Sequence, residues 1–124
     1  MKLNPDCVRD LLLEIEQSTD SNKMYTYSPQ DEYLKKYDKN TVYYHFRQAA
    51  LSELLYNPEF DMSGDFYCVD LSPKGHQFLN DIRSENNWKK TKEIAANVGS
   101  FSLDALSNIA TSVITNLISG KLTP

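Results

Sequence analysis

The spacing of apolar residues changes twice along the chain, and this change limits the folds that the sequence allows. Up to residue 55 the apolar residues repeat at helical spacing, over 59–71 they alternate, and from residue 73 the helical spacing returns. Ser63 and Gly64 interrupt the alternating stretch, as is typical of a tight turn between two antiparallel strands. The sequence therefore predicts an α+β fold with a β-hairpin at 59–71 between helices.

Three helices and one short strand are predicted before this hairpin. In each of the first two helices a polar cap residue stands directly before a proline at the first helical position: Asn4 before Pro5, and Ser28 before Pro29. The third helix follows a polar turn and keeps the helical spacing of its apolar residues. We expect helices at 5–18, 29–37 and 41–55, with the strand at 24–27.

A fourth helix is predicted directly after the hairpin, where Ser72 caps it and Pro73 opens it. Two helices joined by a tight polar turn, then a hairpin and a further helix, follow the order of a winged helix-turn-helix domain. In that arrangement 41–55 is the recognition helix and the loop around 61–65 is the wing. We therefore predict a winged helix-turn-helix domain over 1–85.

The charge of the chain shifts near the end of this domain. Residues 1–82 contain 14 acidic and 8 basic side chains, a formal charge of −6, whereas residues 83–124 contain 3 and 5, a charge of +2. The formal charge of the whole chain is −4, which argues against a protein whose main task is to coat nucleic acid. We predict that 86–124 forms a separate C-terminal helical extension.

Two helices are expected in this extension, at 88–98 and 103–118. Asn87 and Ser102 suit their caps, and Gly99 suits the end of the first. The last helix has a wide apolar stripe in heptad order, made of Leu103, Leu106, Ile109, Ala110, Val113, Ile114, Leu117 and Ile118. Such a stripe must be buried, either on a second copy, on its own domain or at a membrane surface. We favour a homo-oligomer.

Four separated stretches resemble a known family. They are MKLNPDCVRD at 1–10, LSPKGHQFL at 71–79, WKKTK at 88–92 and GSFSL at 99–103. Together they resemble the domain-of-unknown-function family 2513 over nearly the whole chain. The resemblance implies a phage or prophage of Gram-positive bacteria as the source and a winged-helix-like fold, and it implies no established activity.

The predicted recognition helix and one basic cluster supply the candidate contacts to DNA or to a partner. Arginine and glutamine side chains read base edges, while threonine and tyrosine hydroxyls contact phosphates. The basic cluster at 88–92 is expected to assist these contacts. The candidates are Thr41, Tyr43, Tyr44, Arg47 and Gln48 in the helix, with Lys89, Lys90 and Lys92 in the cluster.

Two functions remain open for this surface. The first is a DNA-binding or transcription-regulatory accessory protein that uses the recognition helix. The predicted wing, however, carries Glu59, Asp61 and Asp65, which repel phosphates. The second is a protein–protein interaction module that binds a host or phage protein through its tyrosine-rich helix and acidic wing.

No arrangement of catalytic residues is found in the sequence. His45 and His76 are isolated, Cys7 and Cys68 have no CxxC spacing, and no phosphate-binding or nucleophile motif occurs. We therefore expect a protein that is not an enzyme and has no cofactor, metal or small-molecule substrate. No signal peptide and no run of about 18 apolar residues is seen, so we expect a cytoplasmic protein without membrane contact.

Overall fold

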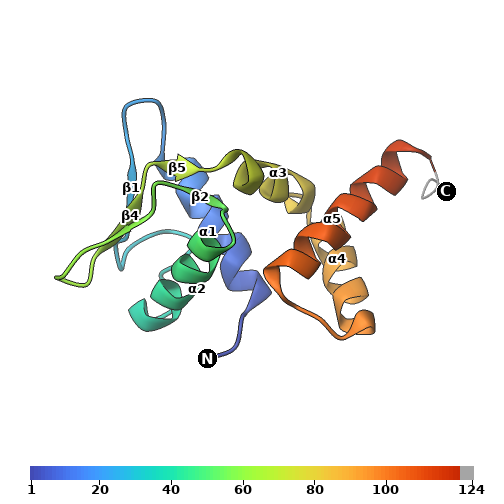
Figure 1. Cartoon of the computed structure of the whole chain (residues 1–124), viewed down its shortest axis with the longest axis horizontal. Helices are drawn as coiled ribbons and strands as arrows, with labels where there is room; N and C mark the ends of the chain where they lie inside the picture. The colour runs from blue at the N-terminus through green and yellow to red at the C-terminus, as the bar shows by residue number, and fades with distance from the viewer. Residues whose placement is uncertain (121–124) are drawn as a thin grey trace. The chain divides into compact units, whose positions relative to one another are not determined.

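The computed structural model describes residues 1–120 and confirms the α+β prediction (Figure 1). Within these residues the chain has five helices and two small antiparallel sheets. They divide into two compact units, Met1–His76 and a second that begins at Gln77. This division falls inside a helix, whereas the predicted boundary lies at 85, and residues 121–124 of the predicted extension lie outside the described residues.

Two helices and two sheets make up most of the first unit, and α1 packs against α2 (Figure 1). The larger sheet has the strand order β1-β4-β3, and the smaller sheet pairs β2 with β5. The elements are α1 (Pro5–Ser18), β1 (Tyr25–Thr26), α2 (Lys39–Leu51), β2 (Leu55–Tyr56), β3 (Glu59–Phe60), β4 (Phe66–Cys68), β5 (Asp70–Leu71) and α3 (Pro73–Ile82), which continues into the second unit.

The core of the first unit is built from the apolar faces that the periodicity predicts. It includes Cys7, Val8, Leu11, Leu12 and Ile15 of α1, Val42, Phe46 and Ala49 of α2, and Phe66 and Cys68 of β4. Asn4 caps α1 by accepting a hydrogen bond from the Asp6 amide, as expected. Each large apolar side chain that is fully buried contributes about 1.5–3 kcal/mol to the stability of the fold. Burial of these side chains therefore holds β4 of the hairpin against α1 and α2.

The predicted helix at 29–37 is wrong, because this segment is a run of turns. The Tyr33 amide donates to Glu14 Oε1 of α1 at 2.8 Å and not to a carbonyl of its own segment. The Tyr37 hydroxyl donates to Asp10 Oδ2, also on α1, at 2.7 Å. These side chains of α1 fix the segment by long-range bonds that local sequence does not reveal. The winged helix-turn-helix arrangement therefore stays a prediction.

The helix predicted at 41–55 begins and ends earlier, as α2. Asp38 caps α2 by accepting from the Thr41 amide. At the other end Glu53 takes a left-handed conformation, with φ of 62°. The amides of Glu53 and Leu54 then donate to carbonyls of the last helical turn, at 3.0 and 2.9 Å. This is the Schellman ending that glycine usually forms, so the helix ends without a glycine.

The hairpin is confirmed, but its second strand is divided. β4 pairs with both β1 and β3, and the chain then bends at Val69, so that β5 pairs with β2 in the other sheet. The Val69 amide donates to the Tyr56 carbonyl at 2.9 Å. A single alternating pattern therefore serves two sheets, and the strand predicted through residue 71 ends at Cys68.

The second unit contains the rest of α3, α4 (Glu85–Val98) and α5 (Leu103–Ile118). Ser84, not Asn87, caps α4, because the Ser84 hydroxyl accepts from the Asn87 amide at 3.0 Å. The helix therefore begins three residues before the predicted start. The caps predicted at Gly99 and Ser102 are confirmed, and α5 packs along α4.

Candidate functional site

The five contact residues predicted on α2 lie together on one half of the helix. Its other half is buried and consists of Val42, His45, Phe46 and Ala49. At 100° per residue, the predicted residues fall on the half that turns away from this core. Among them Arg47 is exposed, while Thr41, Tyr43, Tyr44 and Gln48 are half-buried. We call this half the solvent half of α2.

Tyr43 connects the solvent half of α2 with the hairpin. Its ring meets the rings of Phe60 and Phe66 edge to face, with centroids 5.4 and 5.5 Å apart. The guanidinium carbon of Arg47 lies 5.8 Å from the centre of the same ring. These contacts hold the Tyr43 ring in one place, so its exposed edge is available to a partner without further ordering.

The β3–β4 loop, residues 61–65, is held by a single carboxylate. Asp61 Oδ1 accepts from the Ser63 amide at 3.0 Å, the Ser63 hydroxyl at 2.6 Å and the Asp65 amide at 3.0 Å. These bonds, that of the Ser63 hydroxyl above all, hold the pKa of Asp61 below its usual value. Because hydrogen bonds to the charged form stabilise it, the loop is both ordered and negatively charged at neutral pH.

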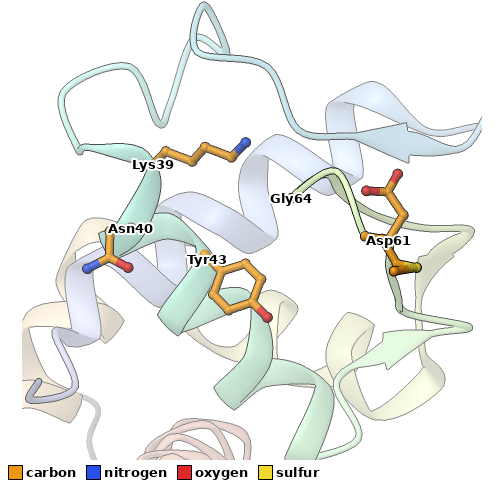
Figure 2. Close-up of a pocket in the computed structure, with 6 residues that line it drawn as sticks. Lys39, Asn40, Tyr43, Asp61 and Gly64 are labelled. Atoms are coloured by element: carbon orange, nitrogen blue, oxygen red, sulfur yellow. The ribbon is translucent and has the colours of Figure 1, made fainter.

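A pocket of about 440 Å³ lies between the start of α2 and this loop (Figure 2). Figure 2 shows the Tyr43 ring facing the hollow and the Lys39 side chain reaching from α2 toward the loop. A Cβ atom built on Gly64 would lie 3.6 Å from Lys39 Nζ. The lining residues are Lys39, Asn40, Tyr43, Asp61, Met62 and Gly64. The sequence predicted Tyr43 as a contact, but only the fold places the other five around it.

His45 is a structural residue of α2. Its Nε2 accepts from the Asn4 amide at 2.8 Å, and because an amide only donates, the ring proton is on Nδ1, 2.8 Å from the Thr41 carbonyl oxygen. Burial holds the pKa of His45 below its usual value, although the bond to Thr41 acts in the opposite direction. Both nitrogens of the neutral ring are engaged, so His45 is not available as a base or as a metal ligand.

The predicted basic cluster forms a surface of its own on α4 in the second unit. Lys89 and Lys90 are exposed and line a hollow of about 380 Å³ together with Asn86 and Glu93. Lys92 instead lies over the Trp88 ring, with Nζ 5.3 Å from the ring centre. The Lys92 ammonium is therefore held by a cation–π contact with Trp88, whereas Lys89 and Lys90 are exposed to solvent.

The apolar stripe of α5 is covered in part by its own chain. Leu103, Leu106, Ala110 and Val113 are buried, so these four predicted oligomerisation residues are unavailable to a second copy. The expectation that the whole stripe meets a partner is corrected accordingly. Ile109 and Ile114 are half-buried, while Leu117 is 39% and Ile118 82% exposed. Self-association stays a prediction, and it now rests on these last four residues.

The described residues, 1–120, lack the features of a metal site, of a reactive thiol and of a helix that spans a membrane. No group of three or more histidine, cysteine or acidic side chains there has the arrangement of a metal site. Burial raises the pKa of both Cys7 and Cys68 to about 12, so neither is a reactive thiolate. None of the helices in this range combines the length and the hydropathy that crossing a bilayer requires.

Comparison with known proteins gives one result. A family model described as a hypothetical protein, DUF2513, matches residues 2–102. The match covers the first unit except Met1 and continues through α3 and α4 to Ser102, the residue before α5. The searches of curated proteins and of solved structures each found no significant match.

Proposed function

The chain belongs to the DUF2513 family of hypothetical proteins, and from this premise we propose that its first unit is a protein-recognition module of phage or prophage type. The module binds a host or phage protein through the solvent half of α2 and the β3–β4 loop. Its two cysteines are unpaired and buried, which fits action in the reducing cytoplasm.

One observation carries this proposal: large apolar side chains stand exposed on the solvent half of α2 and on the hairpin. Leu51, four residues after Arg47 on the solvent half of α2, is 72% exposed. Phe60 of β3 is 39% exposed although its ring contacts Tyr43, and Met62 in the loop is fully exposed. Exposed apolar residues beside ordered aromatic rings are typical of protein interfaces.

The charge of the first unit favours a protein partner over nucleic acid. Residues 1–76 contain 13 acidic and 8 basic side chains, a formal charge of −5. Glu59, Asp61 and Asp65, at the end of β3 and in the loop that follows it, are exposed carboxylates. A phosphate backbone next to this loop would be repelled, whereas a basic protein surface would be attracted.

The test compares partners retained by the immobilised full chain and by matched variants. In the double variant Leu51→Ser with Met62→Ser we expect loss of a protein that the wild type retains from a lysate of the source bacterium. The control Met24→Ser removes a methionine of the same unit that is 43% exposed and lies outside the pocket, and it should retain the partner. Equal retention by all three proteins would refute the proposal.

DNA binding is the second candidate, and one observation favours it. Arg47 is exposed on the solvent half of α2, and Gln48 and Thr41 lie on the same half, so three side chains with hydrogen-bond donors face outward. Anisotropy of a labelled mixed-sequence duplex at low and moderate salt decides between the candidates. A DNA reader would bind at low salt, lose binding in Arg47→Glu and bind more tightly when Asp61 is neutralised to Asn. A protein-recognition module would show no binding at either salt concentration.

A further inference from the structure

We propose that the pocket between α2 and the β3–β4 loop is the anchor site of this module, and that it takes one aromatic side chain from a partner segment whose neighbouring residues are basic. This inference rests on the proposed function, since it names the chemistry of the partner at the same face. The occupant is a short stretch of protein chain, with the aromatic ring inserted and the basic residues at the rim.

The interior of the pocket suits an aromatic ring. Its volume of about 440 Å³ lies within the range of small-ligand sites, about 300–1,000 Å³. The Tyr43 ring faces the hollow in Figure 2 and is already held by Phe60 and Phe66. Met62 contributes a thioether, which makes favourable contacts with aromatic rings. A ring inserted here would meet a second ring and a sulfur atom without ordering Tyr43 first.

The rim of the pocket suits basic neighbours. The hydrogen bonds that Ser63 and Asp65 donate to the Asp61 side chain all go to Oδ1, so they do not occupy Oδ2, which can accept from a cation of the partner. Asp65 and Glu59 are exposed nearby in the chain, so the loop and the strand end before it hold three carboxylates. Lys39 is the one cationic residue among the described residues that line the pocket. A basic segment is therefore attracted to this rim, and an acidic one is repelled.

Two further groups favour an extended chain over a small cation. The Lys39 ammonium and the Asn40 amide line the start of α2 at the pocket, and both donate hydrogen bonds. Main-chain carbonyl groups of an inserted segment are their natural acceptors. A free cation such as an alkylammonium would satisfy the carboxylates but would make no hydrogen bond to these donors and would leave the Tyr43 ring uncovered.

The test uses three capped tripeptides and the full ¹⁵N-labelled chain. Acetyl-Arg-Phe-Arg-amide should shift the backbone amide signals of Asn40, Tyr43, Asp61 and Gly64. Acetyl-Glu-Phe-Glu-amide should bind about tenfold more weakly, because two exposed attractions become repulsions. Acetyl-Arg-Ala-Arg-amide should lose most of the binding, because nothing enters the hollow. The affinity for the first peptide should fall with added salt, as expected for exposed charges.

Matched variants place the binding in this pocket. Met62→Ser should weaken the Arg-Phe-Arg peptide about threefold or more, since it removes the thioether from a fully exposed position that folding does not need. Met24→Ser should leave the affinity unchanged. Equal affinity for the Arg and Glu peptides, equal affinity for the Phe and Ala peptides, or shifts that map to another surface would each overturn the inference.

Failure of this inference is distinguishable from failure of the proposed function. If a protein is retained in a way that needs Leu51 and Met62 but the Arg-Phe-Arg peptide does not bind, the module is supported and its anchor chemistry is refuted. If the peptide binds the pocket but no protein is retained through this face, the pocket chemistry is supported and the proposed module is refuted.

Discussion

Gly75 lies where the first turn of α3 presses against the end of α2 and the start of β2, and replacing it by alanine tests this packing directly. A Cβ atom at Gly75 would lie 2.9 Å from the carbonyl carbon of Leu54 and closer still to its oxygen. The same joint holds a short chain of hydrogen bonds. The Ser72 amide donates to the Leu54 oxygen at 3.0 Å, and the Ser72 hydroxyl donates to the Glu53 oxygen at 2.6 Å.

The expected loss of stability follows from this geometry. In an ordinary helix, replacing glycine by alanine stabilises the protein by about 0.5–1 kcal/mol. Here the helix must move away from Leu54, which breaks the two bonds made by Ser72. The bond from the Ser72 hydroxyl is exposed, so its groups can turn to water, whereas Leu54 is buried and its carbonyl loses a partner at a cost of about 1–3 kcal/mol. We therefore expect Gly75→Ala to lower the free energy of unfolding by about 1–3 kcal/mol, a measurable share of the roughly 5–15 kcal/mol typical of a domain.

Urea denaturation followed by far-ultraviolet circular dichroism measures this loss. The control is Lys74→Ala, since Lys74 is the neighbouring exposed residue of α3 and its change should stay within about 0.5 kcal/mol. Because helix propensity and packing predict opposite signs for Gly75→Ala, the result is decisive. A variant as stable as the wild type, or more stable, would refute the close approach of α3 to Leu54.

Three further predictions concern single side chains of the first unit. Burial lowers the pKa of His45, so the stability that the neutral ring contributes is complete above the unfolded pKa of about 6.5 and is lost as the pH falls below it. The urea midpoint of the wild type should therefore decrease from about pH 7.5 to about pH 5.5. If His45→Gln shows the same dependence of the midpoint on pH, the prediction is contradicted. Glu53→Gly should raise the free energy of unfolding by about 0.5–1 kcal/mol because φ is 62° there, whereas Glu53→Ala, which keeps the strain, should not raise it in the same urea titration. Glu14 is 3% exposed and accepts from Tyr33, Gln17 and Ser18, so Glu14→Gln, which turns one acceptor into a donor, should cost about 2 kcal/mol; a thermal midpoint equal to that of the wild type would show that these bonds are not formed.

The helices with complete local signals are predictable from the sequence. For α1 the cap at Asn4, the proline that follows it and the apolar spacing all agree, and the structure gives the predicted 5–18. The same holds for α5, where Ser102 and the apolar repeat give the predicted 103–118. Local hydrogen bonds and one continuous apolar face are enough to specify such elements, because both are encoded within about four residues of each position.

The segment at 28–38 shows where such signals fail. Ser28 before Pro29 is a good start for a helix, yet Asp31 is bonded to the Tyr25 hydroxyl at 2.7 Å and Tyr33 to Glu14. These bonds join the segment to β1 and to α1. A serine and a proline that favour a helix locally are outweighed by a buried carboxylate that lies 19 residues earlier.

The candidate site was only partly predictable for the same reason. The sequence indicated the solvent half of α2, because a helical period assigns Tyr43 and Arg47 to the side opposite the core. The pocket needed more, since Asp61 and Met62 come from a loop that the strand pairing brings beside the start of α2. Neither residue carries a local signal of this proximity.

The sequence by itself determined the α+β class, the position of the hairpin and the buried faces of α1, α2 and α5, because these depend on period and on caps. Only the tertiary structure decided that 29–37 is not a helix, that the strand after Gly64 serves two sheets, and that half of the α5 stripe is already covered within one chain. Each of these depends on hydrogen bonds or burial between residues far apart in the chain, for which one-dimensional spacing contains no information.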